Sequence, residues 1–221
     1  MSWLTAIPIY KKKTPDPRQV ISTEWIDRDE VLDEDVNLFC WKRTEEVAIQ
    51  DFLTAVINQR PAPLVFSANQ ENLRVQLEVL RHTWDDLAEV NGDAFWEDLY
   101  QLVHDFLSFS DTHSGTVHLR VIDDNACSKF HVDGYNLRLF TTYIGQGTQW
   151  LAEQFTNRKG LGKTNELIIR NENEIQQMKP FEVGILKGEI PGKRRKLKGI
   201  VHRSPPIEHV GEKRIILRVD I

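Results

Sequence analysis

The chain has 221 residues, of which 40% are hydrophobic and 28% are charged, and its formal net charge is −5. This composition is typical of a globular protein, and it excludes a disordered chain or a fibrous repeat. The acidic balance argues against non-specific binding to nucleic acid. Because the composition does not change abruptly along the chain, we expect a single domain.

The cysteine content and the N-terminus indicate a compartment. Cys40 and Cys127 are too few for a disulfide framework, so we expect two free thiols in a reducing environment. An apolar run at residues 3–10 precedes three lysines at 11–13, which reverses the order of a secretory signal. No stretch approaches the roughly 18 consecutive apolar residues of a membrane span. We therefore expect a cytoplasmic protein without a membrane partner.

The first half of the chain is predicted to be mostly helical. Residues 1–43 carry three prolines and an acidic run without sustained periodicity, which predicts an irregular segment packed on the body. In residues 44–115, apolar residues recur at intervals of three and four, the spacing of one helix face. This supporting region is predicted to hold helices after residue 44, around 73–80 and over 93–109, with a short strand at 64–66.

From residue 116 onward the apolar period changes to two, which is typical of strands. After the strand that begins there, further strands are predicted at residues 137–144, 148–151, 181–186, 199–202 and 214–221, with a polar insertion at 152–180. Helices followed by many short strands, without βαβ alternation, indicate an α+β fold. We predict a double-stranded β-helix over 116–221, that is, a cupin-like jelly roll with supporting N-terminal helices.

An H-x-D pair, His131 and Asp133, is the first candidate for chemistry. On a strand, residues two apart point to the same face, so both side chains converge. Two imidazoles and one carboxylate fill one face of an octahedron and leave three positions free, a set that suits Fe(II). The third ligand is predicted to be His202, near the end of the strand expected at 199–202.

Two arginines follow on the last predicted strand. Arg214 and Arg218 come twelve and sixteen residues after His202, and their spacing of four puts them on one face of that strand. A guanidinium group pairs bidentately with a carboxylate. The pair is therefore suited to hold the far end of a dicarboxylate whose other end chelates a metal.

This ordered set of motifs resembles the Fe(II)/2-oxoglutarate dioxygenase superfamily. Arg214 matches the position at which the taurine-dioxygenase-like branch anchors 2-oxoglutarate, and Arg218 matches the second arginine of that branch. The resemblance covers the predicted jelly roll, and it implies Fe(II) held by His131, Asp133 and His202 with 2-oxoglutarate as co-substrate. The sequence around His131, Asp133 and His202 is also similar to a bacterial family of unknown function. That similarity implies no substrate.

Three functions stay open at this stage. The resemblance implies an oxygenase of the hydroxylase or demethylase type, in which iron carries the difficult chemistry and the substrate is unidentified. The alternative is a cupin-like protein that binds a metal or small molecule without oxidation, and a third is a degenerate barrel that serves as an interaction scaffold. An oxygenase requires an anchor for its co-substrate, so the orientation of Arg214 and Arg218 separates the first two.

Four further residues are weaker candidates. Tyr143 is a candidate to reach a carboxylate of the co-substrate through its hydroxyl, but the favoured interpretation is core packing with the hydroxyl satisfied. His118 and Arg120 share the less apolar face of the strand that precedes His131. The resemblance makes them candidates for contacts to the metal ligands or to substrate, with a solvated strand face as the alternative. Trp150 is a candidate for lining the substrate entrance, but the favoured interpretation is burial in the β core.

A basic run, Lys193, Arg194, Arg195 and Lys196, lies shortly before His202. Most runs of this kind form a solvated surface. The functional alternative is a clamp for an anionic substrate or for a nucleic-acid backbone. The sequence does not indicate an oligomeric state.

Overall fold

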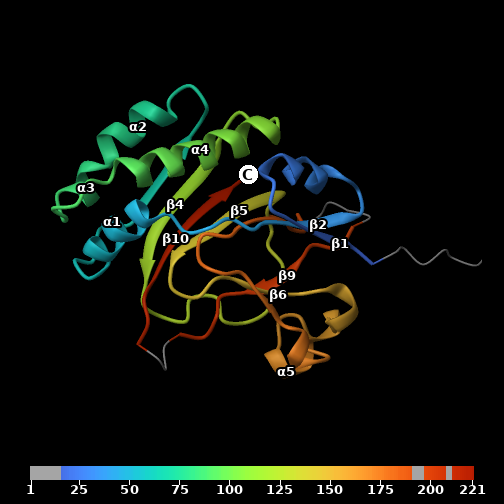
Figure 1. Cartoon of the computed structure of the whole chain (residues 1–221). Helices are drawn as coiled ribbons and strands as arrows, with labels where there is room; N and C mark the ends of the chain where they lie inside the picture. Colours follow the sequence, from blue (N-terminus) through green and yellow to red (C-terminus); the bar gives the residue numbers. More distant parts are fainter. Residues whose placement is uncertain (1–15, 191–196, 208–210) are drawn as a thin grey trace, which may run out of the picture.

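Figure 1 shows the computed structural model of the chain, which describes residues 16–190, 197–207 and 211–221. Residues 1–15 of the predicted irregular segment lie outside the described residues, as does the basic run at 193–196. Within the described ranges, none of the helices combines the length and the apolar character that a membrane crossing requires.

A large sheet forms the centre of the fold. In the described part of the chain it has seven strands in the order β1-β2-β8-β5-β10-β4-β3. These strands are β1 (Arg18–Ser22), β2 (Val36–Trp41), β3 (Leu64–Ala68), β4 (Gly115–Ile122), β5 (Leu137–Ile144), β8 (Val183–Lys187) and β10 (Arg214–Asp220). All neighbours pair antiparallel except β1 and β2, which are parallel. The chain thus has a mixed α/β fold with a mainly antiparallel sheet.

Helices pack on one side of this sheet (Figure 1). They are α1 (Val47–Ile57), α2 (Leu73–Leu80), α3 (His82–Asp85) and α4 (Asp93–Phe109). The apolar stripe of α4 and the alternate residues of β4, β5 and β10 are buried together in the largest core cluster. The predictions of helices at 73–80 and 93–109 are confirmed, because apolar spacing of three and four reports directly on a buried helix face.

The period of two in β10 separates two environments. Ile215, Leu217 and Val219 belong to the core on the helical side. Since alternate residues of a strand point to opposite faces, Arg214, Arg218 and the residues in register with them face away from the helices. This second face of the large sheet carries most of the charged residues of the candidate site.

A small sheet lies on that second side, with strand order β7-β6-β9 (Figure 1). Its strands are β6 (Gln149–Leu151), β7 (Gln176–Gln177) and β9 (Val201–Arg203). His131 extends it by an isolated antiparallel bridge to His202. A smaller apolar cluster, which includes Trp150, Leu186 and Ile200, fills the space between the two sheets.

The first segment of the chain is more regular than predicted. The expectation of irregular structure over 1–43 is wrong for its described part, which contains β1, β2 and the 3-10 helix η1 (Trp25–Leu32). All residues of β2 except Trp41 are buried. A strand that is covered on both faces has no apolar period of two, so the sequence pattern does not reveal it.

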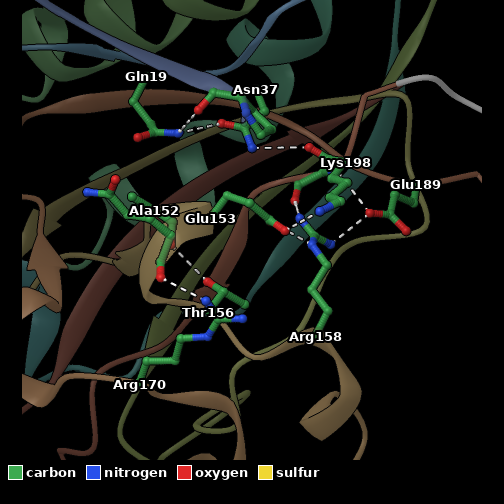
Figure 2. Close-up of polar contacts among 12 residues, drawn as sticks. Gln19, Asn37, Ala152, Glu153, Thr156, Arg158, Arg170, Glu189 and Lys198 are labelled. Atoms are coloured by element: carbon green, nitrogen blue, oxygen red, sulfur yellow. Dashed lines mark hydrogen bonds and ion pairs between the residues drawn. The ribbon is translucent and has the colours of Figure 1, made fainter. Parts of the chain in front are cut away.

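The predicted insertion at 152–180 folds into short helices and β7. The helices are η2 (Glu153–Phe155), η3 (Arg158–Gly160), α5 (Asn165–Ile168) and η4 (Glu172–Glu174). Figure 2 shows how Arg158 ties this region to the segment that leads into β9: its Nε donates to Glu153 (2.7 Å) and its Nη1 to Glu189 (2.9 Å). Its Nη2 donates to the backbone carbonyl of Gly199 at 2.5 Å. The insertion therefore braces the approach to His202.

Candidate metal centre

The structure brings His131, Asp133 and His202 together. Nε2 of His131 lies 3.5 Å from Oδ1 of Asp133, and Nε2 of His202 lies 3.3 Å from Oδ2 of the same carboxylate. One ligand atom from each of the three residues falls within 4.8 Å of the others. Two imidazole nitrogens and a carboxylate oxygen at such separations are able to share one metal ion.

The backbone sets this arrangement. His131 and His202 face each other across the bridge, where each backbone N–H donates to the other residue's carbonyl, at 2.9 and 3.0 Å. Asp133 follows two residues later, and its carbonyl accepts a hydrogen bond of 2.7 Å from the backbone N–H of Glu189. Gly188 lies so close to the Asp133 carbonyl that a side chain there would collide with it. These contacts hold the H-x-D segment against the segment that leads into β9.

Both imidazoles are oriented as metal ligands require. Nδ1 of His131 lies 2.8 Å from the carbonyl of Lys129, and Nδ1 of His202 lies 3.2 Å from the carbonyl of Ile200. A carbonyl oxygen only accepts, so each Nδ1 carries the proton in these hydrogen bonds. A neutral imidazole in this orientation presents the lone pair of Nε2 to the centre, which is the usual arrangement of a metal-bound histidine.

Asp133 is held in its charged form. Burial alone would raise the pKa of Asp133, but the neighbouring imidazoles of His131 and His202 and the charge of Arg138 outweigh burial and bring that pKa below its usual range. Nη1 of Arg138 lies 2.7 Å from Oδ2 of Asp133. A carboxylate that is ionised across the ordinary pH range is the form that binds a cation.

Arg138 and Asp220 were not predicted from the sequence. Nε of Arg138 donates to Oδ1 of Asp220 at 2.5 Å, and both side chains are buried. A usable signal is present in the pattern, because Arg138 and Asp220 are charged residues at strand positions flanked by Leu137 and Val219. The sequence pattern does not give the register between β5 and β10 that puts Arg138 opposite Asp220.

Arg214 is a fully buried arginine with unused donors. Its Nη2 donates to Oγ1 of Thr142 at 3.2 Å, whereas Nε and Nη1 have no hydrogen-bond partner among the described residues. Burial lowers the pKa of Arg214 to about 10. Buried guanidinium nitrogens without partners are costly, so this side chain is suited to receive an anion.

Arg218 is engaged within the fold. Its Nη2 lies 3.0 Å from Nε2 of His118, and its Nε lies 3.1 Å from Oδ2 of Asp220 as an ion pair without hydrogen-bond geometry. His118 thus contacts Arg218, and it also lies 3.5 Å from Oδ2 of Asp220. Arg120 is exposed on β4, where it is in register with Ile216 of β10.

A family model described as "Protein of unknown function (DUF1826)" matches residues 23–220. The chain belongs to the DUF1826 family. The expectation of a family of unknown function is thereby confirmed. No curated protein matches the chain.

Solved structures similar to the DUF1826 chain include two plant enzymes. The dioxygenase for auxin oxidation 1 from Arabidopsis thaliana, in complex with 2-oxoglutarate, is 9% identical, with coverage of 92% of this chain and 91% of that chain and a TM-score of 0.48. The dioxygenase for auxin oxidation from rice is 10% identical, and the match covers 83% of this chain and 72% of that chain with a TM-score of 0.47. These likenesses establish neither an activity nor a ligand for the present chain.

Tyr143 of the DUF1826 chain does not face the metal centre. It is buried in the core on the helical side, where its hydroxyl donates to Oδ2 of Asp98 at 2.7 Å and its ring packs edge-on against Phe95 and Phe181. The prediction that Tyr143 contacts the co-substrate is wrong. The physical reason is the strand alternation of β5, which puts Tyr143 on the same face as the apolar Leu139.

Trp150 lies beside the site but not at an entrance. It is directly opposite His202 in the antiparallel pairing of β6 with β9, and only 5% of its surface is exposed. It packs with Leu186 and Ile200 between the sheets. The entrance prediction is therefore wrong and the core alternative is confirmed, because a large aromatic side chain in this position fills the interior.

Proposed function

We propose that this DUF1826 chain is an Fe(II)- and 2-oxoglutarate-dependent oxygenase whose substrate is unidentified. His131, Asp133 and His202 hold the iron, and Arg214 holds the far carboxylate of 2-oxoglutarate. The observation that carries the proposal is the convergence of the Nε2 atoms of His131 and His202 on the buried carboxylate of Asp133. This donor set leaves three octahedral positions for ligands other than the protein.

Arg214 supports the use of a dicarboxylate. Its guanidinium group is buried on the face of β10 that points away from the helices, and two of its nitrogens have no partner within the described residues. A carboxylate accepts two parallel hydrogen bonds from such a group, and exclusion of water strengthens them. Thr142, already in contact with Arg214, orients the guanidinium group.

The proposed architecture is the double-stranded β-helix. Along the chain, β4 belongs to the large sheet, His131 bridges to the small sheet, and β5 returns to the large sheet. After β5, the strands β6 and β7 lie in the small sheet, β8 in the large sheet, β9 in the small sheet and β10 in the large sheet. This alternation between two sheets supports a jelly roll. The histidine ligands then come from the small sheet and the arginines from the large sheet.

Iron would supply the redox chemistry that couples decarboxylation of 2-oxoglutarate to succinate with oxygenation of the substrate. The protein contributes geometry and exclusion of water. The carbonyls that bind Nδ1 of His131 and His202 hold the imidazoles in place, and burial keeps His202 and Asp133 out of bulk solvent. Arg214 orients the co-substrate by its far end, so that its 2-oxo acid end is available to the metal.

Anaerobic titration with Fe(II) and 2-oxoglutarate tests the proposal. We expect a metal-to-ligand charge-transfer band in the visible spectrum of the wild type and no band in His131→Ala. Arg214→Met loses charge-assisted hydrogen bonds of about 1.5–3 kcal/mol, so it requires roughly ten- to hundredfold more 2-oxoglutarate for the same band. Tyr143→Phe is the matched control. It changes the core on the helical side of the large sheet, so its band should equal that of the wild type.

Each of the other outcomes contradicts the proposal. Iron that binds without a band on addition of 2-oxoglutarate would favour the cupin-like binding protein. A wild-type protein that takes up no iron would favour the scaffold. An undiminished band in Arg214→Met would remove Arg214 from its role as the anchor.

A further inference from the structure

Arg138 lies between two buried carboxylates. Its Nη1 is 2.7 Å from Oδ2 of Asp133, and its Nε donates to Oδ1 of Asp220 at 2.5 Å. The exposed fraction is 9% for the side chains of Arg138 and Asp133, and 1% for that of Asp220. An arginine in this position connects a candidate metal ligand to β10 of the large sheet.

The fold holds Arg138 in place before any metal binds. Arg138 of β5 and Asp220 of β10 are directly opposite in the antiparallel register, the arrangement in which opposite charges interact best across a sheet. The guanidinium carbon also lies 4.8 Å from the centre of the Tyr135 ring. These contacts restrict the rotamers of a long side chain, so that the guanidinium group presents Nη1 to Asp133 at no further entropic cost.

The contact with Arg138 fixes Asp133 without using up its oxygens. Although Nη1 is 2.7 Å away, Oδ2 of Asp133 is buried and accepts no hydrogen bond of good geometry among the described residues. Its lone pairs are available to a cation. Arg138 therefore restrains the position of the carboxylate and leaves its donor capacity to a metal.

A cation next to a metal site also repels the metal, and the sign of the net effect depends on Asp220. Asp220 lies 2.5 Å from Nε of Arg138 and 3.1 Å from Nε of Arg218, so its charge offsets part of the positive charge of the two guanidinium groups. The repulsion of an incoming metal by Arg138 is thereby reduced. The orienting effect on Asp133 is not reduced, and the clamp requires that it outweigh the remaining repulsion.

We propose that Arg138 and Asp220 form a clamp that positions Asp133 for metal binding. The inference rests on the proposed function only in taking His131, Asp133 and His202 as the metal ligands. Arg138 acts through Asp133, and Asp220 acts through Arg138, so both are positioning residues. Loss of an outer partner of a metal ligand typically costs about 10–100-fold in metal affinity.

Co(II) titration of the apoprotein, followed by visible absorption at a temperature well below the unfolding transition, tests the clamp. Arg138→Met and Asp220→Asn should each weaken Co(II) binding, the former by about 10–100-fold. In the Arg138→Met background, Asp220→Asn should have no further effect, because a residue that acts through another shows no independent contribution in a double-mutant cycle. Arg138→Lys, which keeps the charge, should recover part of the affinity. Tyr143→Phe removes a buried hydroxyl from the core on the helical side of the sheet, and it should leave the affinity for Co(II) unchanged.

The outcomes separate the clamp from the proposed function. A wild type that binds no Co(II) refutes the metal centre itself. A wild type that binds, together with an Arg138→Met protein of equal or higher affinity, overturns the clamp and leaves the centre standing. Additive effects of the two substitutions would also overturn it. Should Arg138→Met fail to fold, Arg138→Lys and the nearly isosteric Asp220→Asn decide the matter, and wild-type affinity in both contradicts the clamp.

Discussion

The hydroxyl of Tyr143 donates a hydrogen bond to Oδ2 of Asp98, 2.7 Å away, on the helical side of the large sheet. Asp98 also forms an ion pair with Arg43, so it keeps a partner when the hydroxyl is removed. We predict that Tyr143→Phe lowers the free energy of unfolding by about 1 kcal/mol, the usual net value of one hydrogen bond. Denaturant unfolding measures this loss. The affinities for Fe(II) and 2-oxoglutarate should not change, and a large loss of co-substrate affinity in this variant would contradict the placement of Tyr143.

Gly145 and Gly162 provide a matched pair. Both have positive φ, +85° and +81°, so alanine costs backbone strain of about 1 kcal/mol at either position. At Gly145 the new Cβ would also lie 2.5 Å from the carbonyl oxygen of Lys213 and 2.9 Å from Cγ of Arg214, whereas at Gly162 no atom of the described residues lies within 4 Å. Gly145→Ala should therefore destabilise the protein more and weaken 2-oxoglutarate binding. Equal effects of both substitutions on unfolding and on co-substrate affinity would show that Gly145 does not shape the Arg214 site.

The two cysteines should react at very different rates. Burial, with a smaller contribution from the charge of Glu182, raises the pKa of the Cys40 thiol to about 12, while Cys127 is exposed. Only the thiolate is nucleophilic, and Cys40 is both protonated and inaccessible at pH 8. A chromogenic disulfide reagent should modify one thiol per native chain rapidly and the second only after denaturation. Two rapid equivalents in the native protein would contradict the burial of Cys40.

His118 should stay neutral to unusually low pH. Burial and the neighbouring cation of Arg218 lower its pKa, against the opposing charge of Asp220. An NMR titration of the imidazole protons should give a value below about 6.5, that of an unperturbed histidine, and Arg218→Met should raise it. Because the unfolded chain takes up this proton at higher pH, the group lowers stability as the pH falls below about 6.5. A pKa at or above that value would contradict the contact with Arg218.

The sequence predicts the parts of the fold in which one face of an element is buried. The alternation in β4 and β10 is visible because their apolar residues meet the helices, and α4 shows its buried stripe for the same reason. The sequence pattern does not predict β2, because nearly all residues of this strand are buried and its apolar and polar residues do not alternate. The side chain of Tyr143 was assigned to the wrong face of the sheet although Leu137 and Leu139 precede it at the same period.

The candidate site is only partly visible in the sequence. His131 and Asp133 are two residues apart, so a local motif reveals them, although the structure forms only an isolated bridge at His131 and no strand over 131–133. Arg138 and Asp220 are 82 positions apart, and only the register between β5 and β10 makes them neighbours. The burial of Arg214 likewise depends on packing between sheets, which no local pattern reports.

Anomalous diffraction at the iron K edge, from crystals grown anaerobically with Fe(II), tests the central claim most directly. We predict one strong peak within coordination distance of Nε2 of His131, the carboxylate of Asp133 and Nε2 of His202. The same peak should be absent in crystals of His202→Ala. Iron bound elsewhere, or no peak between these three side chains under saturating Fe(II), would contradict the proposed metal centre.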